Sequence, residues 1–306
     1  MIQWIAETLN LAFREQWALE NVINGLKSLA IGGGARGFIA TCMMIMEMFG
    51  MLLGGNAVSA WGQELDLQDY ELVYVDEFEG DELNLTDWRV RGPGKTRGGF
   101  NSASQLAVKD GNLYLTGEYV ENGTYGDGWY GVSVALRELY LRGYFEIRCK
   151  CAASDAFWSA FWIQGMKSPY DAAISQGGLE SCEIDIFEAM GYGEKGRQNA
   201  VTQTIHCAGV GGETEGFQSR ILGFFNGKDI YSEYNTYGLE WTEDEYIFYV
   251  NGVETTRSSF GEGVCRNAEE VIISLCVPSA EEFEGRDKSE KCEMVVDYVK
   301  IYQKAE

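Results

Sequence analysis

The sequence predicts an all-β fold, a β-sandwich of about 245 residues, for the part of the chain that follows residue 61. Short runs of alternating apolar and polar side chains recur from Gln63 onward, separated by glycine, asparagine and aspartate. Helical periodicity is almost absent after residue 62, and no internal repeat or long linker divides this region. We therefore expect one β-sandwich domain over residues 62–306, preceded by a helical and apolar leader over residues 1–60.

The leader has two parts. Residues 1–36 carry apolar side chains at near-helical spacing, which predicts an amphipathic helix. An apolar run from Gly37 to Leu53 follows, and Val58-Ser59-Ala60 fits a signal-peptide cleavage pattern, so we expect a secreted or cell-surface protein. The long segment in front of the run and the charge of Glu47 depart from that pattern. A mis-assigned start codon would explain the long segment. A membrane anchor, formed by an uncleaved leader, and a plain soluble helix are the alternatives to secretion.

The strands of the sandwich are predicted from runs rich in β-branched and aromatic residues. In chain order these runs are at 72–75, 112–115, 144–149, 246–250, 271–275 and 295–302. Asp110-Gly111 and Asn251-Gly252 are dipeptides of two-residue hairpin turns, because both positions of such a turn need positive φ.

The overall charge limits the class of partner. The formal net charge is −23, with 47 acidic and 24 basic residues, which argues against nucleic acid and sulfated polymers because both are polyanions. A neutral polymer is the better match. The single histidine, His206, excludes a metal site built from several histidines.

The eight cysteines form no Cys-x-x-Cys pair, so neither a zinc ribbon nor a thioredoxin-type site is supported. We interpret most of them as small buried apolar residues, as in an organism that lives without oxygen. The sequence leaves the disulfide pairing open.

The stretch with the most chemistry is Glu183-Ile184-Asp185-Ile186-Phe187-Glu188. In a strand, Glu183 and Asp185 share one face, and strict alternation would bury Glu188 with the isoleucines at a cost of several kcal/mol. One extra residue, accommodated as a β-bulge after Asp185, returns Glu188 to the acidic face. The alternative is a solvated strand face that carries three acids by chance.

Paired carboxyl groups cleave glycosidic bonds, and retaining enzymes hold the two about 5–5.5 Å apart. Glu183 and Glu188 can meet above the bulge, with Asp185 hydrogen-bonded to one of them. Crowded like charges raise one pKa, which a general acid at neutral pH requires. The residues alone do not decide which glutamate is the nucleophile.

Aromatic side chains near this strand suit a polysaccharide, because sugar rings have apolar faces that stack on indole. Trp158 and Trp162 are four residues apart and share a face, although one of them can equally be a core residue. Trp129 and Tyr130 lie in a glycine-rich stretch that we interpret as an exposed loop. His206, on the strand after the acids, is either structural or a cleft residue.

Taken together, residues 68–302 resemble glycoside hydrolase family 16. The most specific element is the E-x-D-x-x-E signature, matched by Glu183, Asp185 and Glu188. Supporting segments, in the expected order, are 75–78 with Trp88 downstream, 143–146, 160–162, 237–241 with 249–252, and 296–302. The resemblance implies a concanavalin-like β-jelly roll with a concave substrate cleft. It also implies retaining chemistry, with Glu183 as nucleophile, Asp185 as its partner and Glu188 as acid/base.

The same resemblance implies no catalytic cofactor but a structural calcium ion. Asp297 matches the position of its carboxylate ligand, and Glu77 and Gly111 match positions that supply main-chain carbonyls. Asn101 aligns loosely with a polar cleft position. Ser159 stands where a proline is common, and Met166–Ser181 is an unusual loop.

The bulged signature is similar to the laminarinase-like and agarase-like branches of the family. Because the chain is acidic, sulfated galactans are disfavoured, and we expect an endo-β-glucanase that cleaves neutral β-1,3- or mixed β-1,3/1,4-glucan. We also expect a monomer. A hydrolase of agar- or porphyran-type β-galactan is the first alternative. A non-catalytic carbohydrate-binding protein is the second, although the presence of both glutamates speaks against it.

Overall fold

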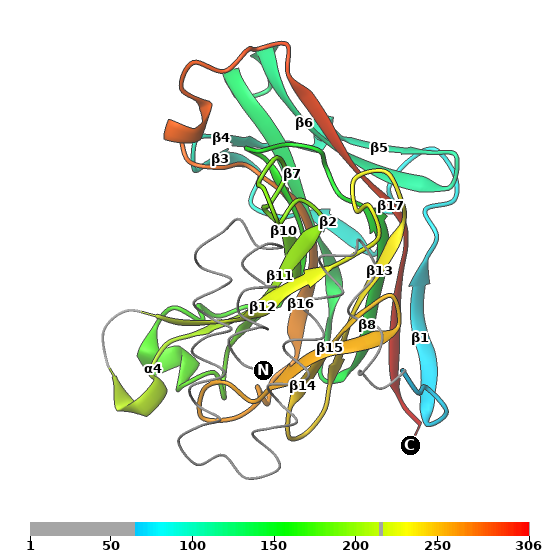
Figure 1. Ribbon diagram of the computed structural model, residues 1–306, viewed down its shortest axis with the longest axis vertical. Coiled ribbons are helices and arrows are strands. Elements are labelled where there is room, and N and C mark those ends of the chain that lie inside the picture. The colour runs from blue at the N-terminus through cyan, green and yellow to red at the C-terminus, as the bar shows by residue number, and fades with distance from the viewer. Residues whose placement is uncertain (1–64, 214–216, 306) are drawn as a thin grey trace, which may run out of the picture. The chain divides into compact units, whose positions relative to one another are not determined.

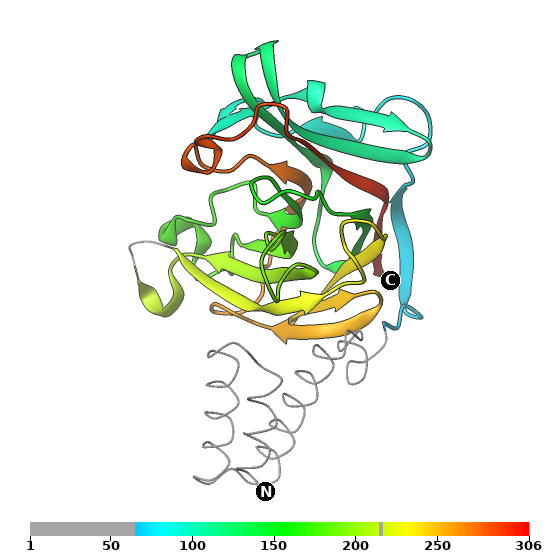
Figure 2. The ribbon, with the colours of Figure 1, turned by 45° about the horizontal axis from the view of Figure 1, so that its top comes forward.

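The computed structural model describes residues 65–213 and 217–305, and it arranges them as two packed β-sheets (Figures 1 and 2). The predictions for residues 1–60 fall outside this part of the chain. The predicted β-sandwich is confirmed. Within the described ranges, no helix is long and apolar enough to cross a membrane.

The first sheet has the order β15–β14–β13–β8–β17, and β17 also pairs with β1 and with β6. Both views show β1, in cyan, beside β17, in dark red (Figures 1 and 2). Its strands are β1 (Tyr70–Asp76), β5 (Leu106–Lys109), β6 (Asn112–Gly123), β8 (Gly143–Lys150), β13 (Asn235–Trp241), β14 (Tyr246–Val250), β15 (Val253–Ser258) and β17 (Lys291–Lys304).

The second sheet has the order β2–β7–β16–β9–β10–β11–β12. Its strands are β2 (Trp88–Val90), β7 (Gly126–Tyr140), β9 (Trp158–Gln164), β10 (Glu183–Ala189), β11 (Ala200–Cys207), β12 (Gln218–Asn226) and β16 (Glu269–Cys276). The short strands β3 (Gly94–Thr96) and β4 (Gly99–Asn101) pair with each other, and β4 runs parallel to β7. Helical turns are α4 (Ala172–Ser175), η2 (Ala103–Gln105), η3 (Val210–Gly212) and η4 (Glu281–Phe283).

The core lies between the two sheets. Ile184, Ile186 and Phe187 of β10 are fully buried, and the Phe187 ring packs on Tyr237 of β13 with ring centres 4.1 Å apart. Because alternate residues of a strand point to opposite faces, the acidic side chains of β10 lie on the face that points away from the core. We call this outer face of the second sheet the cleft face.

The two predicted hairpin turns are present. Lys109 pairs with Asn112, and Asp110 and Gly111 between them have φ of 53° and 66°. Val250 pairs with Val253 across Asn251 and Gly252 in the same way. Turns with two positive φ values match the twist of the flanking strands, which explains why Asp-Gly and Asn-Gly stand there.

The prediction that Trp129 and Tyr130 lie in an exposed loop is wrong. Both belong to β7 and are buried, and Trp129 stacks on Phe283 with ring centres 4.7 Å apart. The glycines around them have a packing role. A Cβ at Gly131 would lie 2.6 Å from the Leu275 carbonyl oxygen, and one at Gly128 would lie 2.8 Å from the Phe100 ring. Glycine in this strand thus permits close approach of neighbours.

The seven described cysteines are all free thiols, and five of them are buried. This agrees with their interpretation as small buried apolar residues, while Cys42 falls outside the described residues.

Candidate active site

The acidic strand contains the predicted bulge. On the β9 side, Asp185 pairs with Trp162 and Phe187 with Phe161, so Ile186 has no partner of its own. On the β11 side, the register shifts between Asp185 and Glu188. One extra residue in β10 is therefore accommodated between the second and third acids, which returns Glu188 to the cleft face.

Glu183 is half-buried and accepts two hydrogen bonds on the same oxygen. The side-chain amide of Gln164 in β9 and the hydroxyl of Tyr170 both donate to Oε2. Two donors on Oε2 leave Oε1 as the less encumbered oxygen.

Asp185 is 4% exposed, and its hydrogen-bonding partner in the described residues is His206 of β11. Asp185 Oδ2 lies 2.9 Å from His206 Nε2, and His206 Nδ1 lies 2.6 Å from Ser219 Oγ. Burial, and then the charge of Glu183, raises the pKa of Asp185 well above its ordinary value. One proton must lie between Asp185 and His206, because two bare acceptors at that distance would repel each other.

Glu188 has the environment of a general acid. Burial, followed by the charge of Asp185, raises the pKa of Glu188 to about 8, so its protonated form dominates at neutral pH. Trp158 Nε1 donates a hydrogen bond to Glu188 Oε1 at 3.0 Å, and this bond lowers the pKa of Glu188, although burial outweighs it. The three acids thus lie on one face, and burial raises the pKa of two of them, Asp185 and Glu188.

The two predicted tryptophans of β9 both lie on the cleft face. Trp162 pairs with Asp185 across the sheet, and its Nε1 donates to Ser274 Oγ at 3.0 Å. The guanidinium of Arg91 lies 4.8 Å from the Trp162 ring centre, and that of Arg97 lies 4.7 Å from the ring centre of Trp158. Both rings are half-buried, so each has a face held by a cation and a part open to a ligand.

Asn101 supports this side of the site indirectly, because its Nδ2 donates to the Arg91 carbonyl oxygen at 3.2 Å. Trp129 and Tyr130 are not brought to the cleft face, since they pack inside the fold. The structure thus gathers the acids, the two tryptophans of β9 and His206, and leaves the β7 pair apart.

The carboxylate expected to bind the structural calcium ion, that of Asp297, is engaged by a cation of the chain. The Asp297 carboxylate forms an ion pair with Arg148, so it is already neutralised by a guanidinium. Glu77 is exposed, and Glu79 Oε1 lies 3.8 Å from where a Cβ of Gly111 would be, but neither observation tests the main-chain carbonyls expected of Glu77 and Gly111. The structural calcium therefore stays a prediction. Among the described residues, the group with metal-ligand spacing is Glu183, Asp185 and His206, whose ligand atoms lie within 4.8 Å of one another.

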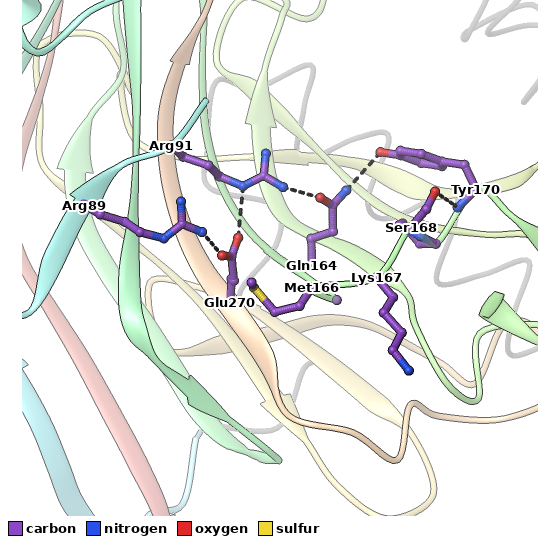
Figure 3. Close-up of a pocket in the computed structure, with 10 residues that line it drawn as sticks. Arg89, Arg91, Gln164, Met166, Lys167, Ser168, Tyr170 and Glu270 are labelled. Carbon is purple, nitrogen blue, oxygen red and sulfur yellow. Dashed lines mark hydrogen bonds and ion pairs between the residues drawn. The ribbon is translucent and has the colours of Figure 1, made fainter. Parts of the chain in front are cut away.

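Several residues of the site were not predicted. A cavity of about 320 Å³ beside Glu183 is lined by Arg89, Arg91, Glu270, Gln164 and the chain from Gly165 to Tyr170 (Figure 3). Gln164 could have been found, because it shares strand parity with Trp162. Arg89 and Arg91 also alternate with Trp88 and Val90. Tyr170 lies in the unusual loop before the acids, where no periodic signal exists.

A β-sandwich that presents three carboxyl groups, two of them with raised pKa values, beside half-buried indole rings has the layout of a polysaccharide-cleaving hydrolase. Comparison with known proteins narrows this class. The family model described as "Beta-porphyranase A-D, GH16 domain" matches residues 72–304. The chain therefore belongs to glycoside hydrolase family 16.

Similar proteins include β-porphyranase E of Zobellia galactanivorans, 33% identical over 133 residues that cover 40% of this chain and 43% of that protein. The endo-1,3-1,4-β-glycanase ExsH of Rhizobium meliloti is 24% identical over 160 residues, or 52% of this chain and 30% of that protein. The chain thus spans less than half of either relative. Among solved structures, SCLam, a non-specific endo-β-1,3(4)-glucanase of the same family, superposes with a TM-score of 0.64 at 21% identity. The match covers 81% of this chain and 97% of SCLam, and it bears on the fold.

Proposed function

We propose that this protein is a retaining, endo-acting hydrolase of β-glycans. The bulge in β10 carries the proposal, because it places Glu183, Asp185 and Glu188 together on the cleft face. A strand face that carried three acids by chance and was exposed to solvent would neither bury Asp185 nor place two hydrogen-bond donors on Glu183.

The proposed reaction has two displacements. Glu188, protonated at neutral pH, donates its proton to the glycosidic oxygen as the bond to C1 breaks, and Glu183 attacks C1 from the other face. The resulting glycosyl ester on Glu183 is then hydrolysed by a water molecule that gives its proton to Glu188. Asp185 and His206 share one proton beside Glu183 and keep the charge of this cluster low.

As substrate we propose a neutral β-1,3- or mixed β-1,3/1,4-glucan. The open parts of the Trp158 and Trp162 rings offer stacking surfaces for sugar rings beside the acids. A relative named as an endo-1,3-1,4-β-glycanase and a fold neighbour named as an endo-β-1,3(4)-glucanase support this choice. Secretion, suggested by the leader, belongs to the same proposal, because such polymers lie outside the cell.

The test is turnover of laminarin and lichenan by Glu183→Gln. We expect a loss of at least about 10³-fold, with an unchanged unfolding midpoint, because the variant keeps the shape of the side chain but not the nucleophile. The matched control is Glu71→Gln, at an exposed position of β1, which should keep full activity. Near-normal turnover by pure Glu183→Gln would overturn the proposal, as would a product of inverted configuration in the wild type.

A β-galactan of the agar or porphyran type is the second candidate, favoured by a specific observation. Arg89 and Arg91 both contact Glu270, so two guanidiniums share one carboxylate at the cavity beside Glu183. Lys167 adds a third cation to the lining (Figure 3). This local positive charge in an acidic chain suits a sulfate ester, and the matching family model is described as porphyranase.

Agarose and porphyran therefore belong in the same substrate panel. If porphyran were the one polymer cleaved, the proposed substrate would change from a β-glucan to a β-galactan, and the proposed retaining mechanism would stand. Tight binding of any of these polymers without turnover by the wild type would identify a carbohydrate-binding protein instead.

A further inference from the structure

The loop between β9 and β10 delivers a tyrosine to the acidic cluster. It is the Met166–Ser181 segment, and its own hydrogen bonds hold it. Ser181 Oγ donates to the Lys167 carbonyl at 2.6 Å, and Ser175 Oγ donates to the Ser181 carbonyl at 2.9 Å. Asp171 caps α4 by accepting from the Ala173 N–H at 2.9 Å. Tyr170, directly before this cap, is thereby anchored from both sides.

The Tyr170 hydroxyl has one proton and directs it at Glu183 Oε2. The same hydroxyl oxygen accepts from Gln164 Nε2 at 3.1 Å, and that amide also donates to Glu183. The three groups thus form a closed triangle in which each polar hydrogen has a defined acceptor. Burial, and then the charge of Glu183, raises the pKa of Tyr170 above its ordinary value, so the hydroxyl keeps the proton it donates.

A chain of contacts fixes the direction of the Gln164 amide (Figure 3). Arg91 donates to Gln164 Oε1, which forces the NH₂ group toward Glu183 and Tyr170. Arg91 is held in turn by Glu270, whose Oε2 accepts from its Nε at 3.0 Å. Both donors to Glu183 therefore have their orientation set before any substrate arrives.

We propose that Tyr170 is a positioning residue that acts with Gln164 to hold Oε2 of Glu183, so that Oε1 is the oxygen that attacks C1. This inference rests on the proposed function and deepens it. The loop is then a working part of the site, since it supplies one of two donors to the nucleophile. Preorganised donors of this kind act by avoiding rearrangement during the reaction.

The ring of Tyr170 offers a competing explanation, in which it serves only as a wall for the sugar. It is 44% exposed and packs on Phe217 with ring centres 5.1 Å apart, while Phe217 lies 5.9 Å from His206. Tyr170→Phe separates the two explanations because it keeps the ring and removes the hydroxyl.

The experiment compares Tyr170→Phe with wild type on whichever polymer the panel identifies. We expect kcat to fall about 10- to 100-fold with KM within about threefold, because the variant keeps the ring and its contact with Phe217. The acid limb of the pH–kcat/KM profile should move upward, because a carboxylate that loses a hydrogen-bond donor is protonated more readily. If the Tyr170 ring served only as a wall for the sugar, Tyr170→Phe would leave both kcat and the acid limb of the pH profile unchanged.

Tyr298→Phe is the matched control, because Tyr298 also donates to a glutamate, Glu146, at 2.8 Å, but on the other sheet. It should leave kcat and the pH profile at wild-type values. Gln164→Met, which removes the second donor, should move the acid limb in the same direction, and the double variant should lose less than the product of the two single losses.

A Tyr170→Phe enzyme with wild-type kcat and an unmoved acid limb overturns the inference and leaves the proposed function intact, provided that Glu183→Gln is inactive. A wild-type protein that cleaves nothing in the panel overturns both.

Discussion

Glu269 provides a prediction whose size follows from the structure. It lies fully buried in β16, where its Oε1 accepts from the Cys182 N–H at 2.9 Å and from the Cys265 thiol at 3.1 Å. Its Oε2 has no hydrogen-bonding partner in the described residues. Burial raises the pKa of Glu269 to about 8 from its ordinary value of 4.5. Glu269→Gln keeps the shape and the accepting oxygen but removes the ionisation.

The sign of the effect follows from where each state holds the proton. Below about pH 4.5 Glu269 is protonated in both the folded and the unfolded chain, so its contribution to the free energy of unfolding is complete. As the pH rises from there toward 8, Glu269 releases its proton in the unfolded chain but keeps it in the folded one, so the free energy of unfolding falls. The loss at about 1.4 kcal/mol per pH unit amounts to about 3 kcal/mol at pH 7. We therefore expect Glu269→Gln to match wild type within about 1 kcal/mol at pH 5 and to exceed it by about 2–3 kcal/mol at pH 7.

Urea unfolding followed by tryptophan fluorescence, at half-unit pH steps from 5 to 8, measures the difference. Asp185 and Glu188 also titrate with raised pKa values, but they do so in both proteins, so the difference isolates Glu269. Glu71→Gln, at an exposed position, should follow the wild-type curve. Stability curves of wild type and Glu269→Gln that run parallel from pH 5 to 8 would refute the reasoning.

Two further predictions concern the acid/base and a turn. Activity should fall above about pH 8 as Glu188 loses its proton, and Trp158→Phe should move this alkaline limb upward, because the indole N–H lowers the pKa of Glu188; a downward move in the pH–rate profile contradicts this. Asn251→Ala should lose about 1–2 kcal/mol in urea unfolding, more than Asn251→Gly, because Asn251 has a φ of 53°. An Asn251→Ala variant as stable as Asn251→Gly would show that the positive φ at this position does not favour glycine over alanine.

Strand parity explains which parts of the site could be predicted. The face of the acids, the need for a bulge and the shared face of Trp158 and Trp162 all follow from the two-residue repeat of a strand. Gln164 obeys the same rule. Tyr170 does not, because a loop has no repeat, and its approach to Glu183 depends on how α4 and its cap fold.

Two predictions relied on averages that the local structure does not follow. A glycine-rich stretch usually marks a loop, but around Trp129 and Tyr130 the glycines make room for Leu275 and Phe100 inside a sheet. Net charge describes the chain as a whole, yet Arg89 and Arg91 meet at the cavity beside Glu183. Charge at a site depends on which strands neighbour each other, and composition does not contain that information.

The bulge in β10 also bears on how the signature could change by mutation. Trp162 and Phe161 are consecutive in β9 and pair with Asp185 and Phe187, while Thr204 and Thr202 in β11 pair with Asp185 and Glu188. Both neighbours thus already have the spacing of a regular strand, and only β10 contains the extra residue, Ile186. Loss of that one codon would yield Glu-Ile-Asp-Phe-Glu with every cross-strand partner kept. The bulged and regular forms of the site are therefore one in-frame deletion apart, a step that no series of substitutions can reproduce.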